Sequence, residues 1–206
     1  MKPDNYLHSI SKDGYTGYAV QDEDPIDPRT WDNLGTMICS NHSRYALGDK
    51  NYEDAVKPDT HIILPLYLYD HGAIELSTTP YQCPWDSGQI GIIAVSKKKA
   101  KKEFEWKRLT KERINKVKSC LEGEVDVYNA YIMGDTYGLI IKDDRNEVVE
   151  TTWGFYGNNW DENGFNQCFN GFIHHNRYLK LRHRIKQIKS YIRHKVPLIY
   201  RKPFKF

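Results

Sequence analysis

The strongest periodic pattern of apolar positions lies in the middle of the chain. Its residues recur at three-to-four spacing, which places them on one face of a helix: Ile114, Val117, Leu121, Val125, Tyr128 and Ile132. Thr110, with Glu112 after it, is suited to open this helix, and Gly134 is suited to end it. We therefore predict a helix over residues 111–133, in which Gly123 costs about 1 kcal/mol relative to alanine.

A second apolar stripe lies near the C-terminus, with spacings of three, four, three and four residues: Tyr178, Leu181, Ile185, Ile188 and Ile192. Basic residues surround it: Arg177, Lys180, Arg182, Arg184, Lys186, Lys189 and Arg193. The pattern predicts an amphipathic helix over residues 177–194. Because a helix of this length is marginal alone in water, we expect its apolar face to dock on the body of the protein. The other face would then present a ridge of positive charge.

Alternating and β-branched stretches predict strands in the first half of the chain, at residues 17–21, 34–40, 61–69, 73–77 and 89–95. Pro65 lies inside the third stretch, which favours an edge position or a bulge there. Ser96 is suited to cap a short lysine-rich helix that follows it. Farther along, residues 137–142 and 147–153 flank the turn formers of 143–146, which predicts a β-hairpin.

The order of these elements is strands, helices, hairpin and helix, which favours an α+β fold. We predict a mainly antiparallel sheet of five to seven strands, with two main helices at about 111–133 and 177–194. Residues 1–16 are polar and are expected to form a loose N-terminal arm. Residues 17–160 are expected to form a single α+β domain, and residues 161–206 a basic C-terminal extension whose amphipathic helix docks on that domain.

The overall composition is that of a soluble globular protein, with 206 residues of which 39% are hydrophobic and 28% charged. No apolar run approaches the roughly 20 residues that a membrane-spanning helix needs. The N-terminus lacks the apolar core of a secretory signal, so the cytoplasm is the expected location. There the four widely spaced cysteines are expected to be free thiols rather than a zinc site.

The charge of the chain is distributed unevenly. Residues 163–206 carry eleven Lys or Arg and no Asp or Glu. Subtracting these charges from the net charge of +3 leaves −8 for residues 1–162. A basic extension suits an acidic macromolecular partner, either nucleic acid or an acidic protein surface. The residues expected to contact it are Arg182, Arg184, Lys186, Lys189 and Arg193.

Three alternatives remain for the basic segment. It can be an ordinary solvated face, or it can pair with the acidic body of the same chain. An anionic membrane surface is the third alternative, although the helix has no Trp or Phe to insert at the interface.

The segment HGAIELSTTPYQCPWDSGQIGII, residues 71–93, holds the residue types of a cysteine nucleophile site. Such a site needs a thiolate, an imidazole to take its proton and an orienting group. Cys83, His71 and Asp86 are the catalytic candidates. Against this role, Cys83 precedes a proline and no helix follows to favour the thiolate. The structural alternative is that Cys83 fills a small apolar gap while Asp86 and Ser87 organise a turn.

Metal-dependent hydrolysis is a weaker interpretation of the same region. Its candidate ligands would be Asp70, His71, Glu75 and Asp86, with His42 or His61 nearby. No recognised ligand spacing supports this site. We therefore predict no metal and no cofactor.

The motifs PWDSGQ and WGFYG are dense in aromatic residues and glycine, and we expect them to lie next to each other around one pocket. The residues expected to bind a ligand or partner there are Trp85, Asp86, Ser87, Gln89, Trp153, Phe155 and Tyr156. The alternative is that these aromatic residues belong to the core and anchor long loops.

Several segments resemble a family of small bacteriophage-encoded accessory proteins: DPRTWDNLGTMIC (27–39), RYALGD (44–49), LPLYLYDHGAIELSTTPYQCPWDSGQIGIIAVSKKKAKKEF (64–104), GEVDVYNAYIMGDTYGLII (123–141) and WGFYG (153–157). The resemblance covers most of residues 25–160 and implies no catalytic residue. The basic extension after residue 165 lies outside it. The implied context is the cytoplasm of an infected bacterium, where such proteins bind host or phage machinery, including host defences.

Two function classes follow from these observations. The favoured one is a non-enzymatic phage accessory protein that binds and modulates a macromolecular partner, either a host protein or a nucleic-acid complex. The rival is a small hydrolase or transferase that uses Cys83 with His71 or Asp86. A hydrogen bond between the Cys83 sulfur and an imidazole in an accessible cleft would favour the enzyme.

Overall fold

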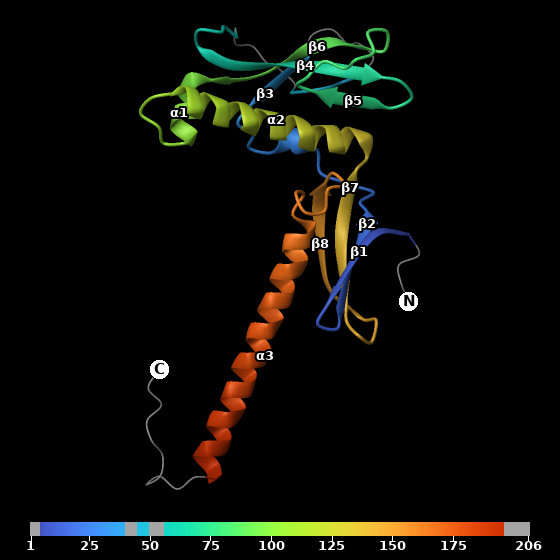
Figure 1. Ribbon diagram of the computed structural model, residues 1–206, viewed down its shortest axis with the longest axis vertical. Coiled ribbons are helices and arrows are strands. Elements are labelled where there is room, and N and C mark those ends of the chain that lie inside the picture. Colours follow the sequence, from blue (N-terminus) through green and yellow to red (C-terminus); the bar gives the residue numbers. More distant parts are fainter. Residues whose placement is uncertain (1–4, 40–44, 50–55, 196–206) are drawn as a thin grey trace. The chain divides into compact units, whose positions relative to one another are not determined.

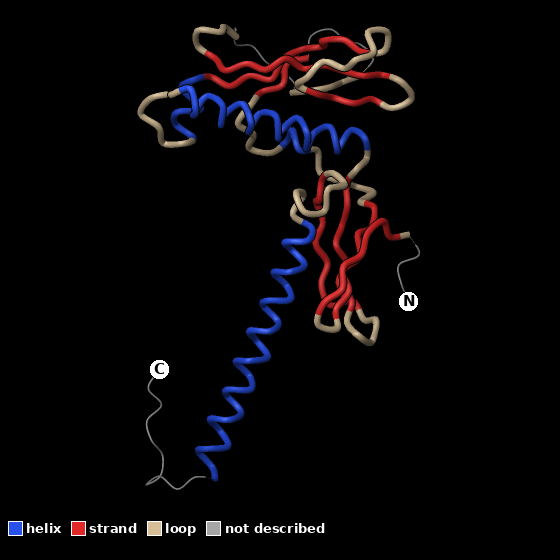
Figure 2. The backbone as a smooth tube through the Cα atoms, viewed as in Figure 1, coloured by secondary structure: helices blue, strands red, loops and turns tan. Residues whose placement is uncertain are grey.

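The computed structural model describes residues 5–39, 45–49 and 56–195, which form three α-helices and eight strands (Figures 1 and 2). The predicted α+β class is confirmed. The strands form two four-stranded sheets, whereas the sequence predicted one sheet of five to seven strands. The chain divides into two compact units. The first comprises Met1–Val20, Leu139–Thr152 and Trp160–Phe206, and the second comprises Gln21–Gly138 and Trp153–Asn159.

The larger unit is built on a sheet with the strand order β3-β6-β4-β5. Its strands are β3 (Thr36–Cys39), β4 (His61–Asp70), β5 (Ile74–Ser77) and β6 (Ser87–Ser96), and each neighbouring pair is antiparallel. β4 alternates between buried and half-buried residues, as a strand with one face on the core does. Its buried residues are Ile62, Leu64, Leu66 and Leu68.

Helix α2 (Lys111–Met133) has the predicted bounds and covers one face of this sheet (Figure 1). The Thr110 side chain accepts a hydrogen bond from the Arg113 amide, and Gly134 ends the helix with a left-handed φ of 76°. Val117, Leu121 and the other buried residues of its apolar face belong to the same hydrophobic cluster as the β4 side chains. The short helix α1 (Lys97–Glu103) begins after Ser96, which caps it as predicted.

Pro65 occupies a position in β4 where its missing amide hydrogen does no harm. β5 pairs with β4 only from Tyr67 onward, so Pro65 lies where β4 is an edge on that side. The pairing of β4 with β6 also shifts register between Leu66 and Tyr67. The expectation of an edge position or a bulge is therefore confirmed.

The second sheet has the strand order β1-β2-β7-β8, and most of its residues belong to the smaller unit. Its strands are β1 (Tyr6–Lys12), β2 (Tyr15–Gln21), β7 (Thr136–Lys142) and β8 (Val148–Tyr156). The β7–β8 hairpin was predicted. The β1–β2 hairpin was not, because β1 is mostly polar and exposed and was taken for part of a loose arm. Asp13 and Gly14 form its turn, both with positive φ, as a tight hairpin turn requires.

Helix α3 (Phe165–Lys195) begins twelve residues before the predicted helix at 177–194. Its first part is rich in Asn and Gly, which gives little helical signal in the sequence. Phe165, Phe169 and Ile173 are nevertheless buried, and their spacing of four places them on one helix face. The Phe169 ring lies so close to Gly17 of β2 that a Cβ there would be 2.8 Å from it. Tertiary burial therefore decides the start of this helix.

Candidate functional sites

The predicted apolar stripe of the C-terminal helix is exposed. Tyr178, Leu181, Ile185 and Ile188 keep 54%, 58%, 40% and 49% of their surface accessible. The stripe is thus not packed against the strands of its own unit, and its docking on the domain of residues 17–160 stays a prediction. The side chain of Ile192 lies outside the part of the chain that the structure describes. Contiguous exposed apolar side chains are typical of surfaces that contact a partner.

Helix α3 is held to its own sheet by its first half and then continues beyond the strands (Figure 2). Phe172 packs edge-on against Tyr15, with ring centroids 5.2 Å apart. Arg177 forms an ion pair with Asp13, and the Lys180 ammonium lies 5.3 Å from the Tyr15 ring centre. These contacts reach the turn of the β1–β2 hairpin. The stripe extends from this region toward the end of the helix.

Most of the predicted basic residues of α3 flank this stripe, and Lys186 lies farther from it. Arg182, Arg184, Lys186 and Lys189 are exposed, while the side chain of Arg193 is outside the described part. Given the spacing of the stripe, Arg177 and Arg184 border one edge, and Arg182 and Lys189 border the other. The segment thus presents apolar and positively charged groups to the same side.

The structure brings the three catalytic candidates together, but not in the order that catalysis requires. The Cys83 Sγ atom lies 3.4 Å from Asp86 Oδ2, and His71 Nδ1 lies 3.2 Å from the same oxygen. The carboxylate thus stands between the thiol and the imidazole. Nucleophilic catalysis needs the imidazole itself to take the thiol proton. The Ser87 hydroxyl donates to the Cys83 carbonyl at 2.5 Å, which fits the alternative that this segment organises a turn.

A shallow pocket beside this turn is lined by Leu68, Asp70, Trp85, Asp86, Ser87 and Gly88. Trp85 is 92% exposed, so it is not a core anchor. The Gln89 amide, also predicted to bind a ligand, donates to the carbonyl of Gly91 two residues along the same strand.

The WGFYG motif lines a different pocket, with the residues Asp22, Asp24, Ile26, Trp31, Trp153, Gly154 and Tyr156. The two pockets share no residue, so the motifs do not meet around one pocket as predicted. Phe155 is only 7% exposed and belongs to the core rather than to a binding surface. Trp31 was not among the predicted site residues, and its segment DEDPIDPRTWDN (22–33) carries no apolar periodicity that would have marked it.

The geometry of this second pocket begins with Trp153, whose ring packs directly over Gly138 of β7. A Cβ at Gly138 would lie 2.2 Å from Trp153 Cε3, so only glycine permits this contact. Gly154 has a φ of +90°, which interrupts the alternation of the strand. Trp153 and Tyr156 consequently line the same pocket, while Phe155 points into the core.

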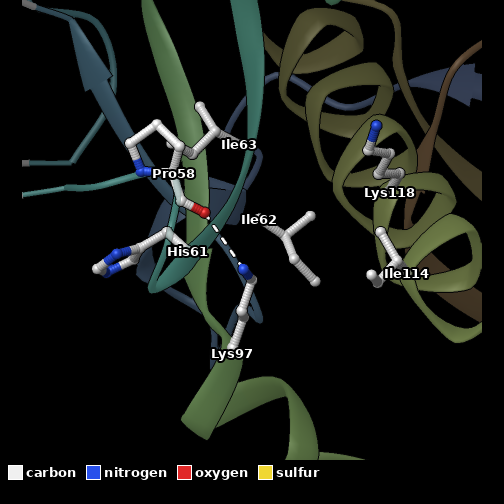
Figure 3. Close-up of a pocket in the computed structure, with 7 residues that line it drawn as sticks. All are labelled: Pro58, His61, Ile62, Ile63, Lys97, Ile114 and Lys118. Atoms are coloured by element: carbon white, nitrogen blue, oxygen red, sulfur yellow. Dashed lines mark hydrogen bonds between the residues drawn. The ribbon is translucent and has the colours of Figure 1, made fainter. Parts of the chain in front are cut away.

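A third pocket, of about 450 Å³, lies between β4 and α2 and is drawn in Figure 3. Pro58, His61, Ile62, Ile63, Lys97, Ile114 and Lys118 line it. The Lys97 ammonium already donates to the carbonyls of Pro58 and Asp59, at 3.2 and 2.8 Å. An incoming anion would therefore have to compete with these two carbonyls for Lys97.

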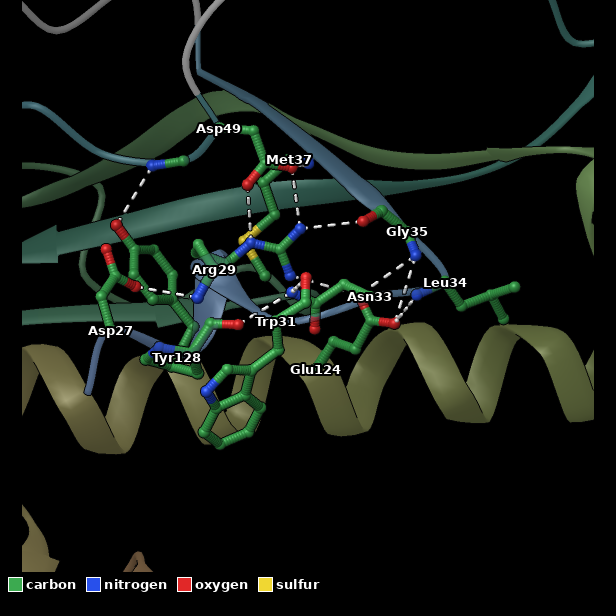
Figure 4. Close-up of polar contacts among 12 residues, drawn as sticks. Asp27, Arg29, Trp31, Asn33, Leu34, Gly35, Met37, Asp49, Glu124 and Tyr128 are labelled. Atoms are coloured by element: carbon green, nitrogen blue, oxygen red, sulfur yellow. Dashed lines mark hydrogen bonds and ion pairs between the residues drawn. The ribbon is translucent and has the colours of Figure 1, made fainter. Parts of the chain in front are cut away.

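A buried ion network, which sequence analysis missed, joins three distant parts of the larger unit (Figure 4). The Arg29 side chain is 4% exposed. Its Nε and Nη2 atoms each donate to a different oxygen of Asp49 at 2.8 Å, and Nη1 donates to Glu124 at 3.2 Å. Nη2 also donates to the Gly35 carbonyl, and Glu124 accepts from the Leu34 amide at 2.7 Å.

This network ties the loop before β3 to helix α2. Burial acts to lower the pKa of Arg29, but the hydrogen bonds and charges of Asp49 and Glu124 outweigh it, so that this pKa is raised. Burial, together with the nearby charge of Asp49, raises the pKa of the Cys39 thiol to about 11. The network's donors and acceptors are paired with one another, which makes it a structural centre rather than a site for a ligand.

Comparison with protein-family models, curated proteins and solved structures yields no match for this chain. Within residues 5–39, 45–49 and 56–195, no three His, Cys, Asp or Glu side chains are grouped so as to hold a metal ion. His42, one of the candidate ligands, lies outside these ranges. Of the helices in the described part of the chain, none has the length and apolarity needed to span a membrane.

Proposed function

We propose that the protein is a non-enzymatic binding protein whose helix α3 captures an acidic amphipathic helix of a partner protein. The observation that carries this proposal is the exposed stripe of Tyr178, Leu181, Ile185 and Ile188, bordered on both edges by basic residues. Its spacing of three, four and three residues is that of a helix that packs against another helix. In keeping with the resemblance to phage accessory proteins, the partner is proposed to be a host or phage protein.

The charges along the stripe favour a partner of opposite sign over a second copy of the chain. In a helix pair, the residues that border the apolar seam face those of the partner. Two copies of α3 would place Arg182, Arg184 and Lys189 against Arg or Lys, which is repulsive in either orientation. A partner helix with Glu or Asp at these positions would instead form ion pairs across the seam.

The same stripe distinguishes a protein partner from nucleic acid. Duplex DNA offers phosphates to the basic residues, but it would leave Leu181, Ile185 and Ile188 in water. A partner helix with apolar residues covers them and gains roughly 25 cal/mol for each Å² of apolar surface buried. Nucleic-acid binding, predicted from charge alone, is therefore the competing outcome.

The enzyme alternative has less support. Asp86 lies between the Cys83 thiol and the His71 imidazole, and the thiol donates its hydrogen to the carboxylate.

The test is a calorimetric titration of the full chain with three ligands. The first is a designed helix with Leu and Ile along its seam and Glu at the flanking positions. The second is the same helix with Lys at those positions, and the third is a duplex DNA. We expect binding of the Glu peptide alone, and loss of binding in Leu181→Ser/Ile185→Ser. A matched variant, Lys186→Gln/Gln187→Ser, changes positions away from the seam and should bind normally.

The dependence of binding on salt concentration distinguishes the remaining outcomes. Binding of DNA should weaken with a slope of log K against log salt of about −0.9 for each phosphate contacted. DNA binding that survives Leu181→Ser/Ile185→Ser, without binding of the Glu peptide, would replace the protein partner with nucleic acid. Concentration-dependent dimers of the free chain, lost in the same double variant, would assign the stripe to self-association.

A further inference from the structure

The pocket beside the WGFYG motif combines aromatic rings with unneutralised negative charge. Its volume is about 400 Å³, within the range of roughly 300–1,000 Å³ typical of small-ligand sites. Trp31 and Trp153 are 46% and 52% exposed, although indole rings normally bury most of their surface. All seven lining residues belong to the larger unit, and none of them takes part in the proposed binding through α3.

The aromatic walls are fixed in place. The Trp31 and Tyr156 rings meet at 84°, with centroids 5.2 Å apart. The Tyr156 hydroxyl donates to the Ile26 carbonyl at 2.6 Å, which holds the ring in this position. Trp153 rests on Gly138, as described above. Rings held by packing and hydrogen bonds form a preorganised surface, so a ligand need not order them.

The negative charge comes from Asp22 and Asp24. Among the residues that the structure describes, neither carboxylate forms an ion pair. Burial, and after it the charge of Asp22, raises the pKa of the Tyr156 hydroxyl, which agrees with a negative potential in the pocket. Hydrogen bonds from the Asp24 amide to Asp22 Oδ1, and from the Asp22 amide to Thr136, fix this turn at the pocket rim.

From these observations we infer that the pocket binds a weakly hydrated organic cation, an alkylated ammonium or a guanidinium group. Such a cation is attracted by the faces of Trp and Tyr and by nearby carboxylates. An inorganic cation prefers a shell of oxygen ligands, which aromatic walls do not supply. A primary ammonium is a compact and strongly hydrated charge, so its transfer into this pocket is less favourable than that of a guanidinium.

The cation can be a free molecule or the side chain of a peptide, and the two sources call for different probes. Choline and acetyl-arginine amide represent the isolated groups. Peptides carrying trimethyllysine or arginine represent the side chains. The neutral isosteres are 3,3-dimethyl-1-butanol for choline, acetyl-citrulline amide for acetyl-arginine amide, and a citrulline peptide for the arginine peptide. Because these match the cations in shape, a difference in affinity reports the positive charge.

The experiment is a calorimetric titration of the full chain with each probe, accompanied by tryptophan fluorescence. We expect at least one cation to bind about tenfold more tightly than its neutral isostere. Tighter binding of the peptides than of choline or acetyl-arginine amide would assign the site to a side chain, and the reverse to a free molecule. Equal affinity for cations and isosteres, or no binding of any cation, would overturn the inference.

Substitutions test whether the cation binds in this pocket. Asp24→Asn should weaken it about tenfold. Glu23→Gln, which removes the same charge from the neighbouring exposed residue outside the pocket, should leave it unchanged. Trp31→Leu should weaken binding, whereas Trp85→Leu in the other pocket should not. Circular dichroism of each variant shows whether it is folded. Equal loss in Asp24→Asn and Glu23→Gln would mean that net charge, and not this pocket, attracts the cation.

Discussion

Arg177 of α3 and Asp13 of the β1–β2 turn form a two-point ion pair, in which Nη2 donates to Oδ1 at 2.8 Å and Nε donates to the other carboxylate oxygen. Three residues later, Lys180 covers the Tyr15 ring. From Lys180 to Lys195 the helix continues for fifteen residues, a rise of about 22 Å. Within the part of this length whose side chains are described, the exposed residues include Leu181, Arg182, Arg184, Ile185, Ile188 and Lys189. The helix therefore has an anchoring part and an exposed part, and the proposed partner would bind the exposed part.

The ion pair makes a first prediction about pH. The hydrogen bond from Arg177 lowers the pKa of Asp13 below its ordinary value of 3.8. A carboxyl group with a lowered pKa stabilises the fold above its unfolded pKa, and this contribution is lost as the pH falls through the folded value. In Arg177→Gln, an NMR titration should find the pKa of Asp13 raised toward 3.8. Both side chains are exposed, so we expect little change in melting temperature. An unchanged pKa in the variant would mean that the pair is absent in solution.

The buried network predicts a large effect of a single substitution. Arg29→Met leaves the carboxylates of Asp49 and Glu124 without their buried partner, which typically costs about 3–5 kcal/mol. Urea denaturation should detect this loss. Arg145→Met, on the exposed β7–β8 turn, is the matched control and should change stability by less than about 0.5 kcal/mol. A small effect of Arg29→Met would contradict the assignment of this network as a structural centre.

Two glycines predict effects of opposite sign. Gly138→Ala places a methyl group 2.2 Å from the Trp153 ring and should destabilise the protein by about 1–3 kcal/mol. Gly123→Ala adds a methyl group to open space on α2 and should stabilise it by about 1 kcal/mol. Trp85→Ala, at a residue that is 92% exposed, should change stability by less than about 0.5 kcal/mol. Thermal denaturation of the three variants tests this order.

Local patterns in the sequence were sufficient for some elements of the fold. The bounds of α2 follow from its apolar period and caps, and the hairpin 143–146 follows from its turn residues. The start of α3 could not be predicted, because Phe165 and Phe169 are buried by a strand about 150 residues earlier in the chain. The β1–β2 hairpin was missed because polar exposed strands carry little apolar alternation.

Sequence patterns were likewise sufficient for only part of the candidate sites. The basic residues of α3 are visible in the sequence as a run of like charge, but the exposure of the stripe depends on where the strands end. Arg29 meets Glu124 across 95 positions, and no local signal reveals that pair. The fold brings Trp31 and Trp153 into one pocket. The motifs PWDSGQ and WGFYG, which were grouped because of their similar composition, line two different pockets.

The Cys39 thiol predicts a loss of stability at alkaline pH. Its pKa is raised from 9.0 to about 11 in the folded chain, first by burial and then by the charge of Asp49. The neutral thiol is thus favoured by folding, and its contribution to stability is complete below pH 9 and declines as the pH rises toward 11. Burial also raises the pKa values of Tyr81 and Tyr137 from 10.0 to about 12. The loss of stability from ionising these two tyrosines therefore occurs at higher pH.

The measurement is urea denaturation between pH 8.5 and pH 10, a range chosen to bracket the lower pKa of 9.0. Cys39→Ala should lose less stability across this range than the natural chain does. Cys120→Ala removes a different thiol and serves as the control. Identical pH profiles for Cys39→Ala and Cys120→Ala would contradict the assigned shift.

Hydrogen exchange of the full chain tests most directly the claim that α3 carries a partner-binding surface. In the free protein, amides near Phe165, Phe169 and Ile173 should exchange slowly, whereas those from Leu181 to Tyr191 should exchange quickly, because no described strand covers them. Addition of the Glu-flanked helix should protect residues 178–191 and leave the Cys83 and Trp153 regions unchanged. Strong protection of residues 181–191 in the free chain, or protection by the peptide elsewhere only, would contradict the account.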